Sequence, residues 1–218
     1  MENYAIFEKI EKYFFTFLSL ILHPIFIPLY TLYLIILIHS QYFYFNEKSV
    51  LMLLFIFSVL TIIIPLFIVS LMFYLKMITS FHLTTKNERL SVSFILLMFY
   101  FFTIFVLRTI HFPYLIQLYF YALPSILTIL LITQWLYYKL SLHLYGMGSV
   151  IGILLYFRLE MDVISPFYLL FIIILATGLI TTARLILKSH TFKEVNLGFF
   201  LGIVVSYLSL LGLSLILS

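Results

Sequence analysis

Long runs of apolar residues, separated by short polar clusters, follow one another along almost the whole chain. A helix needs about 20 apolar residues to cross the hydrocarbon core of a bilayer, because each residue adds about 1.5 Å. The runs have about this length, and 65% of the residues are hydrophobic while 9% are charged. The pattern therefore predicts one all-α membrane domain over residues 1–218, a polytopic bundle of six to seven transmembrane helices.

Seven apolar runs are the candidate helices, and short polar breaks separate them: 13–39, 50–75, 90–110, 115–138, 143–158, 164–182 and 195–217. The first run contains Pro24 and Pro28, which lack backbone donors, so we expect this helix to be bent. The fifth run is short for a straight span, so its helix should begin before His143 or lean on its neighbours.

Charge and composition narrow the range of partners. The net charge of +4 suits anionic lipid head groups or a phosphate-bearing substrate. No basic stripe is long enough to follow a nucleic-acid backbone, which excludes nucleic acid as a partner. The chain has no cysteine, so disulfides and a thiolate nucleophile are excluded. The acidic start argues against a cleaved secretory signal, and we expect an integral protein of a plasma or inner membrane.

The polar clusters after the second, fourth and sixth runs should lie on one side of the membrane, because successive spans alternate in direction. We call this side the first face. Its polar residues are His82, Lys86, Glu88, Arg89, Lys139, Ser141, His143, Arg184, Lys188, His190, Lys193 and Glu194. The positive-inside rule offers an alternative explanation of these cations: the first face would be cytoplasmic and would have no catalytic role. That rule does not account for the histidines beside the cations.

Cations and histidines together suit chemistry on a phosphate group. Arg offers a planar fork for two phosphate oxygens, Lys offers a point charge, and helix N-termini add backbone donors. One histidine could attack phosphorus while another protonates the leaving oxygen, since both titrate near neutral pH. A histidine at a membrane surface is also commonly structural, and that alternative stays open for His143 and His190.

The run A-R-L-I-L-K-S-H-T-F-K-E, residues 183–194, resembles the third signature of the type 2 phosphatidic acid phosphatase superfamily. In that signature Ser-Arg is followed by five residues, His, three more residues and Asp. The matching positions, with Glu in place of Asp, are Arg184, His190 and Glu194. The second signature, P-S-G-H, is similar to L-S-L-H in this chain, which keeps Ser141 and His143 but not the Pro and Gly.

The first signature of that family is Lys, six residues and Arg-Pro. T-T-K-N-E-R-L at 84–90 is similar to it and supplies Arg89 without its proline. The lysine position would be filled by one of two residues. His82 has the expected six residues between it and Arg89, whereas Lys86 lies only three residues before Arg89. The three pieces follow the family's order, and the resemblance covers about residues 80–205.

The resemblance implies a metal-free phosphohydrolase without a cofactor, which acts on a lipid phosphate or a polyprenyl diphosphate. His190 would attack phosphorus to form a phosphohistidine, and Glu194 would orient its ring. His143 would protonate the leaving group. The phosphoryl oxygens would be held by Lys86, Arg89, Ser141 and Arg184.

Helix geometry sets a condition on this site. Residues six apart on an α-helix point about 120° away from each other. We therefore expect Arg184 to end the sixth helix and His190 to open the turn into the seventh. T-F-K-E at 191–194 is also a capping-box pattern, in which Thr191 caps a helix and Glu194 returns to its backbone. Capping and orienting are alternative roles for Glu194 that need not exclude each other.

Two other functions stay open. The missing Pro and Gly of the signatures favour a catalytically inactive relative that binds lipid or partner proteins in a membrane complex. The proline-broken first run favours a small lipid transporter, although transporter sites usually lie near the bilayer midplane. Outside the signatures, His23 is most simply satisfied by neighbouring backbone. Gly146, Gly148 and Gly152 are expected to allow close helix approach.

Overall fold

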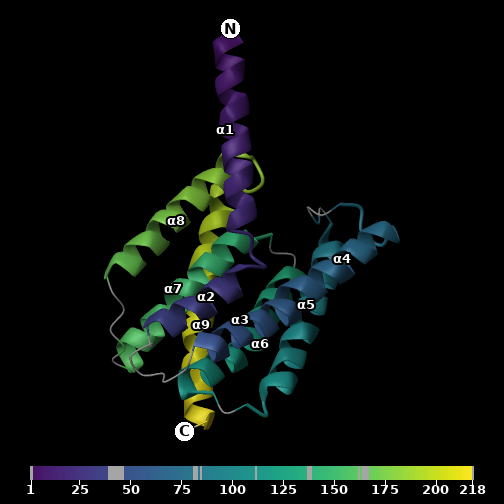
Figure 1. Cartoon of the computed structure of the whole chain (residues 1–218). Helices are drawn as coiled ribbons and strands as arrows, with labels where there is room; N and C mark the ends of the chain where they lie inside the picture. Colours follow the sequence, from purple (N-terminus) through teal and green to yellow (C-terminus); the bar gives the residue numbers. More distant parts are fainter. Residues whose placement is uncertain are drawn as a thin grey trace. The chain divides into compact units, whose positions relative to one another are not determined.

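The apolar runs fold into α-helices (Figure 1), and the part of the chain that the structure describes contains no strand. This computed structural model describes residues 2–38, 47–80, 83, 85–110, 112–136, 139–161, 163 and 167–217. Within these ranges six helices are long and apolar enough to cross a membrane: Glu47–Tyr74, Lys86–Leu107, Tyr114–Trp135, Leu142–Glu160, Tyr168–Ile186 and Phe192–Leu217. The prediction of an all-α, multi-pass membrane protein is confirmed.

The helices divide into two compact units. Unit 1 consists of Met1–Ile27 and Leu140–Tyr207, with the helices α1 (Glu2–Ile21), α7 (Leu142–Glu160), α8 (Phe167–Ile186) and most of α9 (Phe192–Leu217). Unit 2 consists of Pro28–Lys139 and Leu208–Ser218, with α2 (Ile27–Ile38), α3 (Glu47–Ser58), the π-helical turn η1 (Val59–Ile63), α4 (Ile64–Tyr74), α5 (Lys86–Leu107) and α6 (Tyr114–Trp135). In unit 1, α8 packs against both α1 and α7, whereas in unit 2 α5 packs against α4 and α6.

The first apolar run is not one helix. α1 ends at Ile21 and α2 begins at Ile27, with Pro24 in the irregular stretch between them. Proline removes a backbone donor, and its ring disfavours a helical conformation in the residue before it, which here is His23. The bend predicted in the run 13–39 is therefore a complete break between two helices, and residue 39 lies outside the described residues.

Four glycines let α7 and α9 approach backbone to backbone in unit 1: Gly148, Gly152, Gly198 and Gly202. A Cβ added to Gly202 would lie 2.2 Å from the Tyr145 carbonyl oxygen, and one added to Gly148 would lie 2.1 Å from the Phe199 carbonyl oxygen. Since no real Cβ tolerates such distances, only glycine fits there. The glycines are spaced four residues apart on each helix, as in other close membrane helix pairs. The prediction of close helix approach at Gly148 and Gly152 is confirmed.

In unit 2, a buried carboxylate ties the loop between α4 and α5 to the start of α5. Glu88 accepts hydrogen bonds from the Thr79 amide at 2.6 Å, the Thr79 hydroxyl at 2.7 Å and the Thr85 amide at 3.1 Å. The Thr85 hydroxyl accepts in return from the Glu88 amide, which completes a capping box. The loop that carries the first predicted signature is thus held by backbone groups of its own unit.

Candidate functional site

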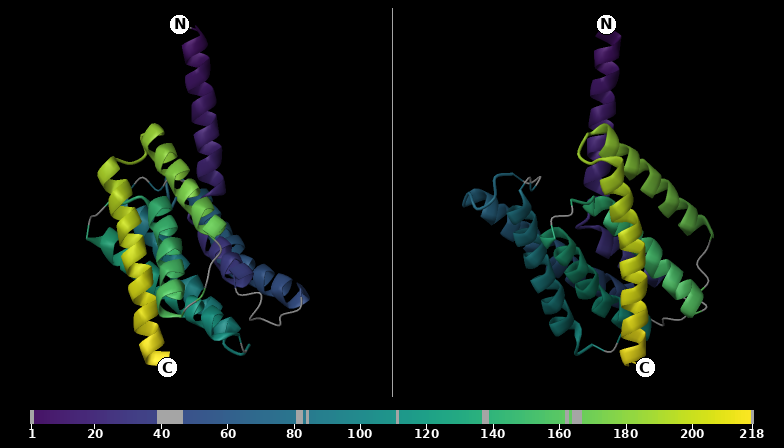
Figure 2. Two further views of the ribbon diagram at one scale, coloured as in Figure 1. Left: turned by 90° about the vertical axis from the view of Figure 1, so that its left-hand side faces the viewer. Right: turned by 180° about the vertical axis from the view of Figure 1, so that it is seen from behind.

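The turn between α8 and α9 brings the two ends of the third signature together. Lys188 has a φ of 50°, in the left-handed region, and reverses the chain after α8. The Arg184 carbonyl oxygen accepts hydrogen bonds from the amides of Ser189 at 3.2 Å and His190 at 3.4 Å. α9 then leaves the turn in a different direction from α8 (Figure 2). α8 ends at Ile186, two residues after the predicted end at Arg184, and a turn separates it from α9, which begins at Phe192.

His190 and Glu194 form a close pair at the start of α9. His190 Nδ1 lies 3.0 Å from Glu194 Oε2, and the two side chains are only 14% and 19% exposed. The Thr191 amide donates to the same carboxylate oxygen at 3.0 Å, and the Thr191 hydroxyl accepts from the Glu194 amide at 3.4 Å. Glu194 therefore caps α9 and holds His190 at once. Because a carboxylate accepts, Nδ1 carries the hydrogen and the lone pair of the neutral ring belongs to Nε2.

The start of α7 lies against the same turn. The Ser141 amide donates to the Glu194 carbonyl oxygen at 3.1 Å. The Ser141 side chain is fully buried, and its hydroxyl has no hydrogen-bond partner among the described residues. His143 follows in the first turn of α7 and is 8% exposed, with Nε2 3.1 Å from the carbonyl oxygen of Ser19 on α1. Since a carbonyl oxygen only accepts, His143 Nε2 carries the hydrogen of this bond.

Sequence reasoning missed His23 as a neighbour of His143. The two ring centroids lie 5.5 Å apart with an edge-on angle of 81°. The Ile25 amide donates to His23 Nδ1 at 3.3 Å, so the predicted backbone partner is present. Burial, and then the charge of Arg184, lower the pKa of His23, which lies outside the six candidate spans. The sequence feature that could have identified His23 is a titratable residue directly before a proline in an apolar run.

Arg184 supplies positive charge to these residues. Its charge acts on the imidazoles of His143 and His23, and its Nε is buried without a hydrogen-bond partner in the described part of the chain. Unit 1 therefore brings together the predicted residues of the second and third signatures, with two neighbours from the end of α1 and the break after it. We call this group the histidine cluster: Ser19, His23, Ser141, His143, Arg184, His190 and Glu194.

The predicted residues of the first signature belong to unit 2. Lys86 Nζ donates to the Trp135 carbonyl oxygen at 2.7 Å, and Arg89 Nη1 donates to the Leu83 carbonyl oxygen at 3.2 Å. His82, the alternative to Lys86, lies outside the described residues. The histidine cluster is thus assembled from unit 1 alone, and the phosphate-binding role of Lys86 and Arg89 stays a prediction.

The histidine cluster has the groups that nucleophilic and acid–base chemistry on an anion requires. Arg184 and the N-termini of α7 and α9 favour negative charge. His190 offers a lone pair oriented by a carboxylate, and His143 offers a second imidazole for proton transfer. Among the residues described, no three His, Asp or Glu side chains gather as a metal site requires. The arrangement can bind and transfer an oxyanion such as a phosphoryl group.

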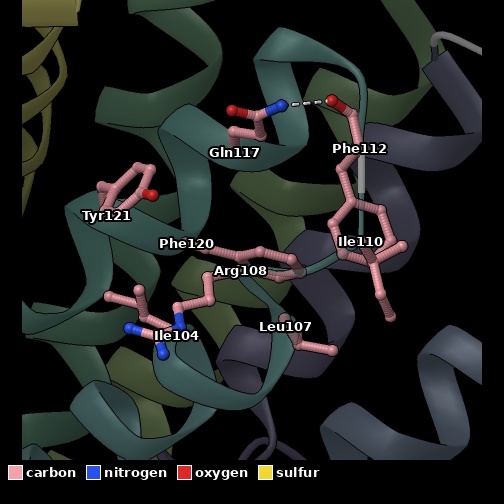
Figure 3. Close-up of a pocket in the computed structure, with 8 residues that line it drawn as sticks. All are labelled: Ile104, Leu107, Arg108, Ile110, Phe112, Gln117, Phe120 and Tyr121. Carbon is pink, nitrogen blue, oxygen red and sulfur yellow. Dashed lines mark hydrogen bonds between the residues drawn. The ribbon is translucent and has the colours of Figure 1, made fainter.

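A separate pocket of about 250 Å³ lies in unit 2, where α5 ends and α6 begins (Figure 3). Its lining is mainly apolar, with Arg108, Gln117 and Tyr121 as the polar exceptions. The Gln117 side chain donates to the Phe112 carbonyl oxygen, and the Arg108 guanidinium lies over the Phe105 ring, 4.2 Å from its centroid. The pocket contains none of the predicted site residues.

No family model, no curated protein and no solved structure matches this chain. The chemistry of the residues in the histidine cluster is therefore the basis for assigning a function.

Proposed function

We propose that the protein is a membrane-embedded lipid phosphatase or diphosphatase that works through a phosphohistidine and is related to the type 2 phosphatidic acid phosphatases. The observation that carries the proposal is the His190–Glu194 pair, with Nδ1 and Oε2 3.0 Å apart in a turn that begins at Arg184. A carboxylate on Nδ1 makes Nε2 a better nucleophile. A nearby guanidinium favours a phosphate at the same place.

The proposed reaction has two steps. First, the bound phosphate dianion pairs with the doubly protonated ring of His143. His190 Nε2 then attacks phosphorus, the N–P bond forms, and the bond from phosphorus to the leaving oxygen breaks as His143 Nδ1 gives that oxygen its proton. Second, a water molecule gives a proton to His143 and its oxygen attacks phosphorus, so the N–P bond breaks and inorganic phosphate leaves. Arg184 and the Ser141 hydroxyl stabilise charge on the phosphoryl oxygens, and Glu194 stabilises the positive charge on His190.

A lipid substrate suits the setting of the histidine cluster. The cluster includes residues at the ends of α7, α8 and α9, which are candidate membrane spans. The phosphate of an embedded lipid can reach such a position while its hydrocarbon chains stay in the bilayer. Lipid phosphomonoesters and polyprenyl diphosphates both offer a terminal phosphoryl group.

Phosphate release by the purified protein in detergent tests the proposal. The substrate panel contains lipid monophosphates and polyprenyl diphosphates, with soluble phosphate esters for comparison, and EDTA is present throughout. We expect release from at least one lipid substrate at a rate that the chelator does not lower. A folded preparation that releases no phosphate from any member of the panel would contradict the proposal.

Two substitutions separate the capping role of Glu194 from its role toward His190. Glu194→Gln keeps an oxygen that can accept from Thr191 but removes the charge opposite His190. We expect kcat to fall by on the order of 10²-fold with little change in unfolding temperature. Glu194→Ala removes the cap as well and should also destabilise the protein by about 1 kcal/mol. If kcat of Glu194→Gln equals that of the wild type, Glu194 is a helix cap alone.

A second candidate is a catalytically inactive relative that binds lipid or partner proteins. The contacts of Lys86 and Arg89 favour it, because both side chains are bonded to backbone carbonyl oxygens in unit 2. This candidate predicts a purified protein that retains a lipid phosphate without hydrolysing it. Mass spectrometry of copurified lipids, combined with the release assay, distinguishes the two candidates.

A further inference from the structure

The end of α1 adds to the histidine cluster polar atoms that the three signatures do not include. Five buried side-chain polar atoms lack a hydrogen-bond partner among the described residues: Ser19 Oγ, Ser80 Oγ, Gln134 Nε2, Ser141 Oγ and Arg184 Nε. Three of these five belong to the histidine cluster. A buried donor without a partner is unfavourable in a folded protein, so a group of them indicates a function such as ligand binding.

His143 is the common neighbour of these three groups. The Ser19 carbonyl oxygen accepts from its Nε2, Ser141 precedes it at the N-cap of α7, and the charge of Arg184 acts on its ring. Ser19 is 8% exposed and Ser141 is 0% exposed, so neither hydroxyl is hydrated by bulk water. Two hydroxyls and a guanidinium are all hydrogen-bond donors. The ligand that suits all three is an oxyanion with several acceptor oxygens.

His23 faces His143 from the break after α1. The edge-on contact, at 5.5 Å between centroids, restricts rotation of the His143 ring, and the Ile25 amide fixes the orientation of His23. With Nε2 of His143 bonded to Ser19, Nδ1 is the ring atom that can exchange a proton with a bound anion. His23 acts on the anion through His143 and is therefore a positioning residue.

The start of α7 and the turn between α8 and α9 form two walls of the anion site. We infer that the end of α1 and the break after it form a third wall, in which Ser19 donates a hydrogen bond to a phosphoryl oxygen and His23 holds the His143 ring. The inference rests on the proposed function for the identity of the anion. It gives the N-terminal helix a part in substrate binding and catalysis.

Calorimetric titration with tungstate, an oxyanion shaped like phosphate, tests Ser19 without turnover. Ser19→Ala should weaken tungstate binding by about tenfold or more, because a hydrogen bond to a charged group is lost. Ser19→Thr, which keeps the hydroxyl, should restore binding. The matched control is Thr16→Ala, since Thr16 lies one turn earlier on α1 and its hydroxyl donates to the Lys12 carbonyl oxygen. Equal weakening by both alanine variants, or a wild type that binds no tungstate, overturns the inference.

His23→Asn tests the positioning role. This variant keeps an acceptor for the Ile25 amide and removes the ring that faces His143, so a purely local role for His23 predicts no effect. We expect kcat to fall by about tenfold while KM and tungstate affinity change by less than about twofold, because the anion donors remain. The His143 tautomer, read by nitrogen NMR, should be Nε2–H in the wild type and mixed in His23→Asn. Unchanged kcat, or an unchanged tautomer in protein without turnover, overturns the role of His23.

The outcomes separate this inference from the proposed function. Lipid phosphate hydrolysis that is indifferent to Ser19→Ala and His23→Asn leaves the proposed function standing without a third wall. Tungstate binding that depends on Ser19, in a protein that hydrolyses nothing, supports the anion site and contradicts the hydrolase.

Discussion

His190→Ala is expected to lower phosphate release by on the order of 10³-fold or more, because it removes the nucleophilic nitrogen. The protein should nevertheless fold. Glu194 keeps its contact with the Thr191 amide at 3.0 Å, so the cap of α9 does not depend on the imidazole. We therefore expect an inactive protein with an unfolding temperature close to that of the wild type.

Lys193→Ala is the matched control for His190→Ala. Lys193 is an exposed cation in the first turn of α9, three residues after His190, and we expect its removal to leave kcat unchanged. A second readout is the intermediate itself. Wild-type protein quenched in alkali during turnover of a radiolabelled lipid phosphate should carry an acid-labile label, and His190→Ala should carry none. Turnover of the variant within about tenfold of the wild type would rule out the phosphohistidine mechanism.

Gly202→Ala is expected to destabilise unit 1 by about 1–3 kcal/mol and to lower kcat, although Gly202 is not part of the histidine cluster. The added Cβ would lie 2.2 Å from the Tyr145 carbonyl oxygen and 3.0 Å from the Ser149 amide nitrogen. Both are backbone atoms, so α7 and α9 must move apart. That movement would also break the 3.1 Å hydrogen bond from the Ser141 amide to the Glu194 carbonyl oxygen. The expected signature is a lower unfolding temperature together with slower turnover.

Gly178→Ala provides the comparison. Gly178 lies on α8, and a Cβ added there meets nothing within 4 Å. Because alanine favours a helix over glycine by about 0.5–1 kcal/mol, this variant should unfold at the same or a higher temperature. Destabilisation of the same size in both variants would show that contact between α7 and α9 is not the cause.

The fold class follows from the sequence because membrane spans depend on length and hydrophobicity, which are local properties. Local chemistry also accounts for the break at Pro24 and for the cap formed by Thr191 and Glu194. The predicted start of the first helix at residue 13, however, is wrong. Hydropathy excluded the charged residues before position 13, whereas α1 begins at Glu2, since a helix requires backbone hydrogen bonds and not an apolar surface.

The candidate site was only partly visible in the sequence. The resemblance to the third signature pointed to His190 and Glu194, and their 3.0 Å contact joins two residues that are close in the chain. Spacing could not identify Ser19, whose partner His143 is 124 residues away along the chain. His23 was missed for the same reason. Such neighbours arise from helix packing, which no local pattern records.

The sequence by itself determined that this chain forms membrane-spanning helices, that the first run breaks near its prolines, and that Arg184 and His190 flank a turn. Each of these depends on interactions between residues close in the chain. The tertiary structure alone decided that the start of α7 meets the start of α9, where the Ser141 amide donates to the Glu194 carbonyl oxygen, and that the end of α1 closes on His143. The physical reason is that glycine contacts and buried hydrogen bonds between distant helices form only when whole helices pack together.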